Sequence, residues 1–488
     1  MVWLVKVVFT SLLRLTYRQD GANAAQRRSR QKPAFPALRQ LAVVITLLTV
    51  LLSQPSTPAQ EASIANRIER AASLIGDNRV EEAEQQLNNV LKVRPNEAAA
   101  LGLLGTIRAK QGRLNDAEAL FARAIRIDNQ LIGVHMNLAY LYLLKGAPDK
   151  TALELREVLR LDPNNADASY RLAWLLLSQG SYDECISLID HAGRAQRPSA
   201  PLLALLGDAY LRKGEMGKAE ESYLLALKEQ DTNADGLLGL ATLYQSSGNS
   251  NAAALYLGRA KGVIVNSPDQ FYKFAVVALN AQLGSDAIAA LKRAIELRPD
   301  EPSYYFLLGV TWLKEPDLQE AEEAFRQSLK LQPNTAEGQM YLGYTLLKQK
   351  KFPEARDWLE KSIKGVAGTP EPFYYLALIA QEQSEDERAV QLFEQAIKLS
   401  PSFAHAHIAL GSTYLKLKNY TRAQQELEIG VKLNPNDSKA HYNLALLYAR
   451  LKDSQRAREE MQIVESLKNS NGQVKEGDIV APPSPRPR

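Results

Sequence analysis

One position constrains this chain more than any other, because it carries only glycine or alanine at every 34th residue. When the chain is numbered in units of 34 residues from Ile64, position 8 of each unit is small. The residues at this position are Ala71, Gly105, Ala139, Ala173, Gly207, Ala241, Ala275, Gly309, Gly343, Ala377, Gly411 and Ala445. Twelve units follow one another without insertion and cover about four fifths of the 488 residues. A regular array of one repeated structural unit is therefore expected.

Each unit has the apolar pattern of two short helices. In the unit from Ala404 to Asp437, Leu410 and Tyr414 are one helical turn apart, and so are Ala423 and Leu427. A turn separates the two patterns. Proline at position 32 of six units gives the second helix a natural end, because proline cannot continue a helix.

The small residues predict closely packed helical hairpins. Position 20 is alanine except at Thr151 and Cys185, whereas position 24 is always large and apolar. A small residue at position 8 lets the first helix approach the second helix at position 20. A leucine at position 8 would overpack that contact by about 1–3 kcal/mol.

This pattern, with large residues at positions 4, 7 and 11, small residues at 8, 20 and 27 and proline at 32, resembles the tetratricopeptide repeat. The resemblance implies an all-α protein, a right-handed α-solenoid of twelve helix-turn-helix units. Because one repeat cannot bury its apolar stripe alone, neighbouring repeats must stack. The predicted repeats fill residues 64–471 and start at 64, 98, 132, 166, 200, 234, 268, 302, 336, 370, 404 and 438.

The first 60 residues form a separate leader in this interpretation. Residues 1–40 hold eight Lys and Arg against one Asp, so the net charge of +4 for the whole chain makes the remainder acidic. The uncharged run Leu41–Leu52 and the small residue Ala59 then fit a cleaved signal peptide. Twelve helical residues span about 18 Å, less than the roughly 30 Å of a hydrocarbon core.

We therefore expect an exported protein, periplasmic or secreted. The alternative is an uncleaved anchor at residues 41–52, which would hold the repeats on the extracytoplasmic side of a membrane. Residues 472–488 lack periodicity and are rich in proline, so they are expected to form a disordered tail.

The sequence contains few residues that could form a catalytic or a metal site. The chain has five histidines and one cysteine, and the closest pair, His405 and His407, would point to different faces of a helix. Leader, repeats and tail leave no residues for a catalytic domain. We expect no enzyme, no cofactor and no metal site. Nucleic acid is not an expected partner, because the chain beyond residue 40 is net acidic and shows no basic stripe.

Partner binding is expected on the first helices of the repeats. In the tetratricopeptide family these helices line a concave groove, and the resemblance implies that positions such as 5 and 9 point into it. The candidates are Met136, Tyr140, Tyr170, Arg171, Trp174, Tyr272, Phe306, Met340, Tyr344, Tyr374 and Tyr442. Tyr and Trp are common anchors for a bound segment, and the strongest candidates are Tyr140, Tyr170, Arg171 and Trp174. The alternative for several of them is packing between adjacent helices.

The resulting hypothesis is a non-catalytic scaffold on the extracytoplasmic side that binds an extended segment of one or more partner proteins in its groove. A first alternative is a self-associating spacer or assembly factor of a cell-envelope complex, such as polysaccharide-export or outer-membrane machinery. A second alternative is carbohydrate binding, because tyrosine and tryptophan also stack on sugars.

Overall fold

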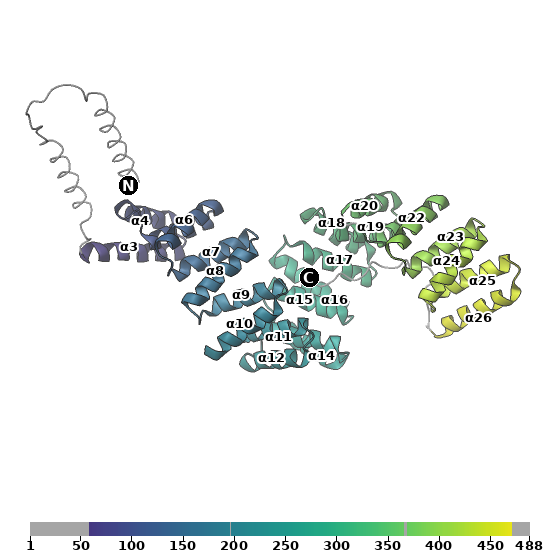
Figure 1. The fold of residues 1–488 in the computed structure, drawn as a ribbon, viewed down its shortest axis with the longest axis horizontal. Coiled ribbons are helices and arrows are strands. Elements are labelled where there is room, and N and C mark those ends of the chain that lie inside the picture. Colours follow the sequence, from purple (N-terminus) through teal and green to yellow (C-terminus); the bar gives the residue numbers. More distant parts are fainter. Residues whose placement is uncertain (1–57, 196, 366–367, 471–488) are drawn as a thin grey trace, which may run out of the picture. The chain divides into compact units, whose positions relative to one another are not determined.

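A computed structural model describes residues 58–195, 197–365 and 368–470 (Figure 1). Within these ranges the chain forms 24 α-helices and no strand, which confirms the predicted all-α class. The predicted leader, apart from its last three residues, and the predicted tail lie outside the described residues. The chain divides into two compact units, Met1–Leu131 and Ile132–Arg488. No helix in the described ranges combines the length and the apolar character that crossing a membrane requires.

The first unit contains two helical hairpins. They are built from α3 (Pro58–Gly76), α4 (Val80–Val93), α5 (Ala98–Lys110) and α6 (Leu114–Ile127).

The second unit contains ten hairpins, and each packs on the hairpin before it in the unit and the one after it (Figure 1). Their helices are α7 (Ile132–Leu144), α8 (Pro148–Leu161), α9 (Ala166–Ser178), α10 (Tyr182–Ala195), α11 (Ala200–Arg212), α12 (Met216–Glu229), α13 (Ala234–Ser246), α14 (Ser250–Val263), α15 (Pro268–Asn280), α16 (Gly284–Leu297), α17 (Pro302–Lys314), α18 (Leu318–Leu331), α19 (Ala336–Lys348), α20 (Phe352–Gly365), α21 (Glu371–Glu382), α22 (Asp386–Leu399), α23 (Ala404–Lys416), α24 (Tyr420–Leu433), α25 (Ser438–Arg450) and α26 (Ser454–Ser470).

The helices follow the 34-residue period closely. The second helix of every hairpin begins at position 17, and the first helix begins at position 1 in all but two hairpins. The exceptions are α3, which begins six residues before Ile64, and α21, which begins one residue after Pro370.

A residue with positive φ at position 15 follows the first helix of each hairpin. After α5, the Gly112 amide donates to the Ala109 carbonyl at 3.0 Å and the Arg113 amide donates to the Arg108 carbonyl at 2.9 Å. This is a Schellman motif, which favours a glycine with positive φ. Residues with positive φ at this position are Asn78, Gly112, Gly146, Gly180, Gly214, Gly248, Gln282, Pro316, Lys350, Ser384, Lys418 and Lys452.

The small residue at position 8 faces the large residue at position 24 of the same hairpin. A Cβ atom on Gly343 would lie 2.6 Å from Leu359 Cγ and 3.3 Å from the carbonyl oxygen of Ala355, which is at position 20. A Cβ atom on Gly309 would lie 2.7 Å from Phe325. The predicted contact with position 20 is therefore present, but position 24 sets the tighter limit.

The next repeat covers this contact with its own residue at position 6. The ring of Tyr341 lies 5.5 Å from the ring of Phe325 in the preceding repeat. The ring of Tyr375 lies 5.2 Å from the ring of Tyr344, which is at position 9 of the preceding repeat. A residue at position 6 thus packs on the preceding hairpin at these two joints between repeats.

Histidines at position 4 connect two neighbouring repeats. His407 Nδ1 lies 2.6 Å from Glu426 Oε2, and its Nε2 lies 3.0 Å from the carbonyl oxygen of Pro401 in the preceding repeat. His441 repeats both contacts, with Glu460 at 2.6 Å and the Pro435 carbonyl at 2.9 Å. Because both acceptors of His407 require an N–H group, the protonated ring suits this contact. Burial lowers the pKa of His407, but the hydrogen bonds to Glu426 and the Pro401 carbonyl together raise this pKa above its ordinary value.

We predict that the stability of the α23–α24 hairpin falls as pH rises above the ordinary histidine pKa of about 6.5. A histidine whose pKa is raised on folding stabilises the fold below its unfolded pKa, and that stabilisation is lost as pH rises through the folded value. Hydrogen exchange of α23, corrected for the intrinsic rate at each pH, measures the effect.

The matched variant is His407→Gln, because Gln339 at the same position donates to the Pro333 carbonyl at 2.8 Å. This variant should lose most of the pH dependence at α23, whereas His405→Gln should keep it. An unchanged pH dependence in His407→Gln would contradict the assignment.

Candidate functional site

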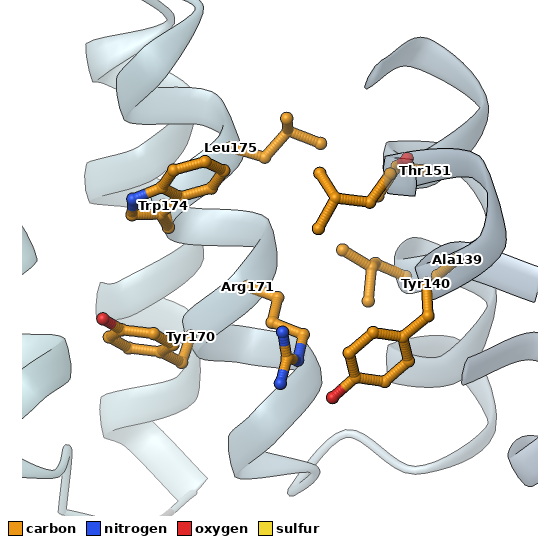
Figure 2. Close-up of a pocket in the computed structure, with 9 residues that line it drawn as sticks. Ala139, Tyr140, Thr151, Tyr170, Arg171, Trp174 and Leu175 are labelled. Atoms are coloured by element: carbon orange, nitrogen blue, oxygen red, sulfur yellow. The ribbon is translucent and has the colours of Figure 1, made fainter. Parts of the chain in front are cut away.

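The second unit contains a pocket of about 220 Å³ between α7, α8 and α9 (Figure 2). Its lining residues are Ala139, Tyr140, Leu143, Thr151, Leu155, Tyr170, Arg171, Trp174 and Leu175. All four of the strongest sequence candidates are among them. Tyr140, Tyr170 and Trp174 are 38, 37 and 47% exposed. The pocket therefore combines exposed aromatic side chains with an apolar interior.

Arg171, at position 6 of the fourth repeat, lines the pocket where two other repeats place a buried tyrosine. Position 6 is not apolar in every repeat, since Gly239, Lys273 and Asn443 also occupy it. In four other repeats of the second unit it carries a large buried apolar residue. These residues are Leu205, Leu307, Tyr341 and Tyr375. At the joint between the third and fourth repeats, the third repeat contributes Ala139 at position 8, Thr151 at position 20 and Leu155 at position 24, and all three line the pocket.

Two contacts hold the Arg171 guanidinium beside Tyr140. Arg171 Nε donates to Asp167 Oδ1 at 2.8 Å, and its Cζ atom lies 4.2 Å from the centre of the Tyr140 ring. The Tyr140 hydroxyl donates to Asp167 Oδ2 at 3.2 Å. Figure 2 shows the guanidinium directed toward Tyr140. A cation over an aromatic face is worth about 0.5–1 kcal/mol at an exposed site, so the arginine is preorganised against the pocket wall.

The interior of the pocket offers few polar groups to a ligand. Most of the lining surface is apolar. The Thr151 hydroxyl donates to the Ala147 carbonyl of its own helix at 3.1 Å. Burial raises the pKa of the Tyr170 phenol above its ordinary value, and the charge of Asp235 raises it further. Tyr170 therefore remains an uncharged hydroxyl at neutral pH.

A network of charged residues fixes the helices beyond Tyr170. Lys273 Nζ lies 2.9 Å from Asp235 Oδ1 and 3.8 Å from Asp208 Oδ2. The Tyr223 hydroxyl donates to Asp208 Oδ1 at 2.6 Å, and burial raises the pKa of Asp208. Burial lowers the pKa of Lys273, but Asp208 and Asp235 more than offset this and raise it. These contacts join α11, α12, α13 and α15, so the charges are paired within the protein.

Three of the sequence candidates lie in the core. Met340, Tyr344 and Tyr374 are 4, 5 and 6% exposed. The ring of Tyr374 lies 5.1 Å from Phe403 and 5.9 Å from Phe393. These side chains fill space between helices, which was the alternative interpretation, and a partner cannot reach them in this conformation.

The remaining candidates lie apart from the pocket. Tyr272 packs on Tyr304 with ring centres 5.5 Å apart, and Phe306 packs on Tyr341 at 5.2 Å. Tyr442 lies in the last repeat and is 44% exposed. Met136 is half-buried against the core of the third to fifth repeats.

Sequence reasoning missed the apolar half of the pocket. Ala139, Leu143, Thr151, Leu155 and Leu175 look like ordinary core residues of the repeat. The signal that could have pointed to them is Arg171, because position 6 is apolar in several other repeats, but Lys273 shares this charge and does not line the pocket. A cluster of His, Cys, Asp and Glu side chains that could hold a metal ion does not occur in the described part of the chain.

Sequence models of the tetratricopeptide repeat match most of the chain. One model matches residues 68–132, 272–334 and 317–370. Two further models with the same description match residues 142–209 and 382–447, and residues 200–233 and 438–471. The matched segments include every residue that lines the pocket except Ala139 and Tyr140.

Several curated proteins are similar over about half of the chain. Cellulose synthase operon protein C of Pseudomonas fluorescens (strain SBW25) is 27% identical over 56% of this chain and 22% of its own length. Cellulose synthase 1 operon protein C of Komagataeibacter xylinus is 22% identical over 52% of this chain and 17% of its own length. The chain thus matches only about a fifth of these relatives.

Among solved structures, a tetratricopeptide repeat protein from Parabacteroides merdae ATCC 43184 is 19% identical, with a TM-score of 0.44. The similarity covers 51% of this chain and 99% of that one.

Stability measurements should separate the pocket residues from the buried tyrosines. Tyr374→Ala removes a buried ring and should destabilise its repeats by about 3 kcal/mol. Trp174→Ala should cost less than about 1 kcal/mol, because nearly half of the side chain is already exposed. Urea unfolding combined with hydrogen exchange of α9 and α21 measures both. Equal losses would show that Trp174 is a core residue.

Proposed function

Because this chain belongs to the tetratricopeptide-repeat family, we propose that it is a non-catalytic scaffold that binds an extended segment of a partner protein at the pocket between α7 and α9. Tetratricopeptide repeats bind proteins. The observation that carries the proposal is the pocket itself, where three exposed aromatic side chains surround an apolar interior. Such side chains provide much of the binding energy at protein interfaces.

The proposed location is the extracytoplasmic side. A basic segment, an apolar run at residues 41–52 and a small residue at Ala59 support export. The two cellulose synthase operon relatives support a role in assembling polysaccharide machinery of the cell envelope. Since only about a fifth of each relative is matched, their names support this role only for the repeat segment.

Carbohydrate binding is less well supported than protein binding. A sugar presents hydroxyl groups around its whole ring, and a site that buries them must provide hydrogen-bond partners. The polar groups at the pocket are few, and both Tyr140 and Arg171 are already bonded to Asp167.

We predict that a photo-crosslinking amino acid at position 174 of the full chain captures a protein segment in cells, because this side chain lies at the pocket mouth. The captured segment is identified by mass spectrometry. The same amino acid at position 442, also exposed on a first helix, should not capture that segment.

The double variant Tyr170→Ala/Trp174→Ala should lose the same partner in affinity capture while keeping its helical circular dichroism. Equal retention by the double variant and the native chain would refute the proposed binding site.

Export is tested separately by joining residues 1–60 to alkaline phosphatase, which becomes active only where its disulfides form outside the cytoplasm. We predict an active fusion in a bacterial host, and loss of activity when Leu47→Arg places a charge in the apolar run. An inactive native fusion would contradict the proposed location.

A further inference from the structure

We propose that the pocket accepts one aromatic side chain of the partner segment, which takes the place that Tyr341 and Tyr375 occupy within other repeats. This inference rests on the proposed scaffold function and specifies the chemistry of its partner. It also assigns Arg171 as the residue that selects an aromatic side chain over an aliphatic one.

The joints between later repeats show what fills this space. At the joint between the eighth and ninth repeats, Tyr341 from position 6 packs on Phe325 and Phe306, with ring centres 5.5 and 5.2 Å apart. At the next joint, Tyr375 from the same position packs on Tyr344 and is fully buried. An aromatic ring from position 6 thus fills the space between neighbouring repeats at these two joints.

The joint below Arg171 lacks this ring. The guanidinium turns to Asp167 and Tyr140, and the small side chains of Ala139 and Thr151 leave the space open. A cavity of about 220 Å³ is smaller than the roughly 300–1,000 Å³ of typical small-molecule pockets. Its size suits a single large side chain.

Charge complementarity favours an aromatic occupant. Tyr140 packs against one side of the Arg171 guanidinium, and the arginine also lines the pocket. A ring inside the pocket can therefore lie against the guanidinium together with Tyr140, and its electron-rich face meets the positive charge. Trp174 and Tyr170 add edge or face contacts between rings. An aliphatic side chain of equal volume gains none of these interactions.

The direct test measures binding of short capped peptides, Gly-Ser-X-Ser-Gly with X as Tyr, Trp, Leu or Ala, to the full chain. Saturation-transfer NMR with competition gives the relative affinities. We expect the Tyr and Trp peptides to bind about threefold or more tightly than the Leu peptide, and the Ala peptide not to bind. Equal affinity for the Leu and Tyr peptides, or no binding by any peptide, overturns the inference.

Two variants of Arg171 make the test specific. Arg171→Tyr should fill the pocket from within, as Tyr341 does at its own joint, and should abolish peptide binding while the melting temperature is kept or raised. Arg171→Lys keeps the charge but lacks the planar group, and should remove most of the preference for aromatic peptides over the Leu peptide. Tyr442→Ala, which changes an exposed tyrosine of the last repeat that does not line the pocket, should leave all affinities unchanged. Peptide binding that survives Arg171→Tyr overturns the inference.

Competition with cellohexaose distinguishes saccharide binding from peptide binding. If cellohexaose competes with the Tyr peptide and loses its binding in Arg171→Tyr, the pocket takes a saccharide and the inference is overturned. If crosslinking at position 174 captures a protein but the peptides show no aromatic preference, the scaffold function stands and only the inferred side chain is wrong. If crosslinking also fails, the proposed function falls as well.

Discussion

The contact between position 8 and position 24 within each hairpin is the constraint on which the other features depend. Where position 8 is glycine, a single added carbon would lie within 2.8 Å of the partner side chain, as at Gly105, Gly207 and Gly411. This leaves the two helices one close packing distance, and within each unit hairpins with the same distance can stack with a constant period. The register of the helices therefore follows from a small residue, glycine or alanine, because a larger side chain would push the helices apart.

The candidate binding site lies where this regular packing between repeats is incomplete. Position 6 of the following repeat closes several joints with an apolar residue, and Arg171 leaves one joint open. The arginine remains in place because Asp167, four residues earlier on the same helix, and Tyr140, on the preceding repeat, both contact it. The network of Lys273 with Asp208 and Asp235 holds the neighbouring first helices beyond Tyr170. The pocket is thus a space between packed helices that no large core side chain fills.

Much of the fold can be predicted from the sequence, because the same spacing of small and large apolar residues recurs in all twelve repeats. The small residues predicted the hairpins, and the start of nearly every helix agrees with the numbering from Ile64. The left-handed residue at position 15 was harder to foresee, since Lys350, Lys418 and Lys452 hold a conformation that glycine adopts more easily.

The candidate site was predicted in part. Periodicity placed Tyr344 and Trp174 at the same position, yet Tyr344 is buried by Tyr375 of the next repeat, whereas no such ring covers Trp174. The exposure of a side chain at position 9 depends on the residues of the next repeat, so the sequence of one repeat alone does not predict it.

A double-mutant cycle at Gly309 and Phe325 tests the central role of the hairpin contact most directly. Gly309→Ala places a Cβ atom against a ring that Phe306 and Tyr341 also confine, and should destabilise the α17–α18 hairpin by about 1–3 kcal/mol. Phe325→Leu alone should also cost stability, because it leaves a cavity. Together they recreate the alanine–leucine pair found at Ala275 and Leu291, so hydrogen exchange of this hairpin should show a smaller loss than the sum of the single losses. Additive losses would show that position 8 does not limit the helix spacing, and the proposed origin of the repeat frame would be wrong.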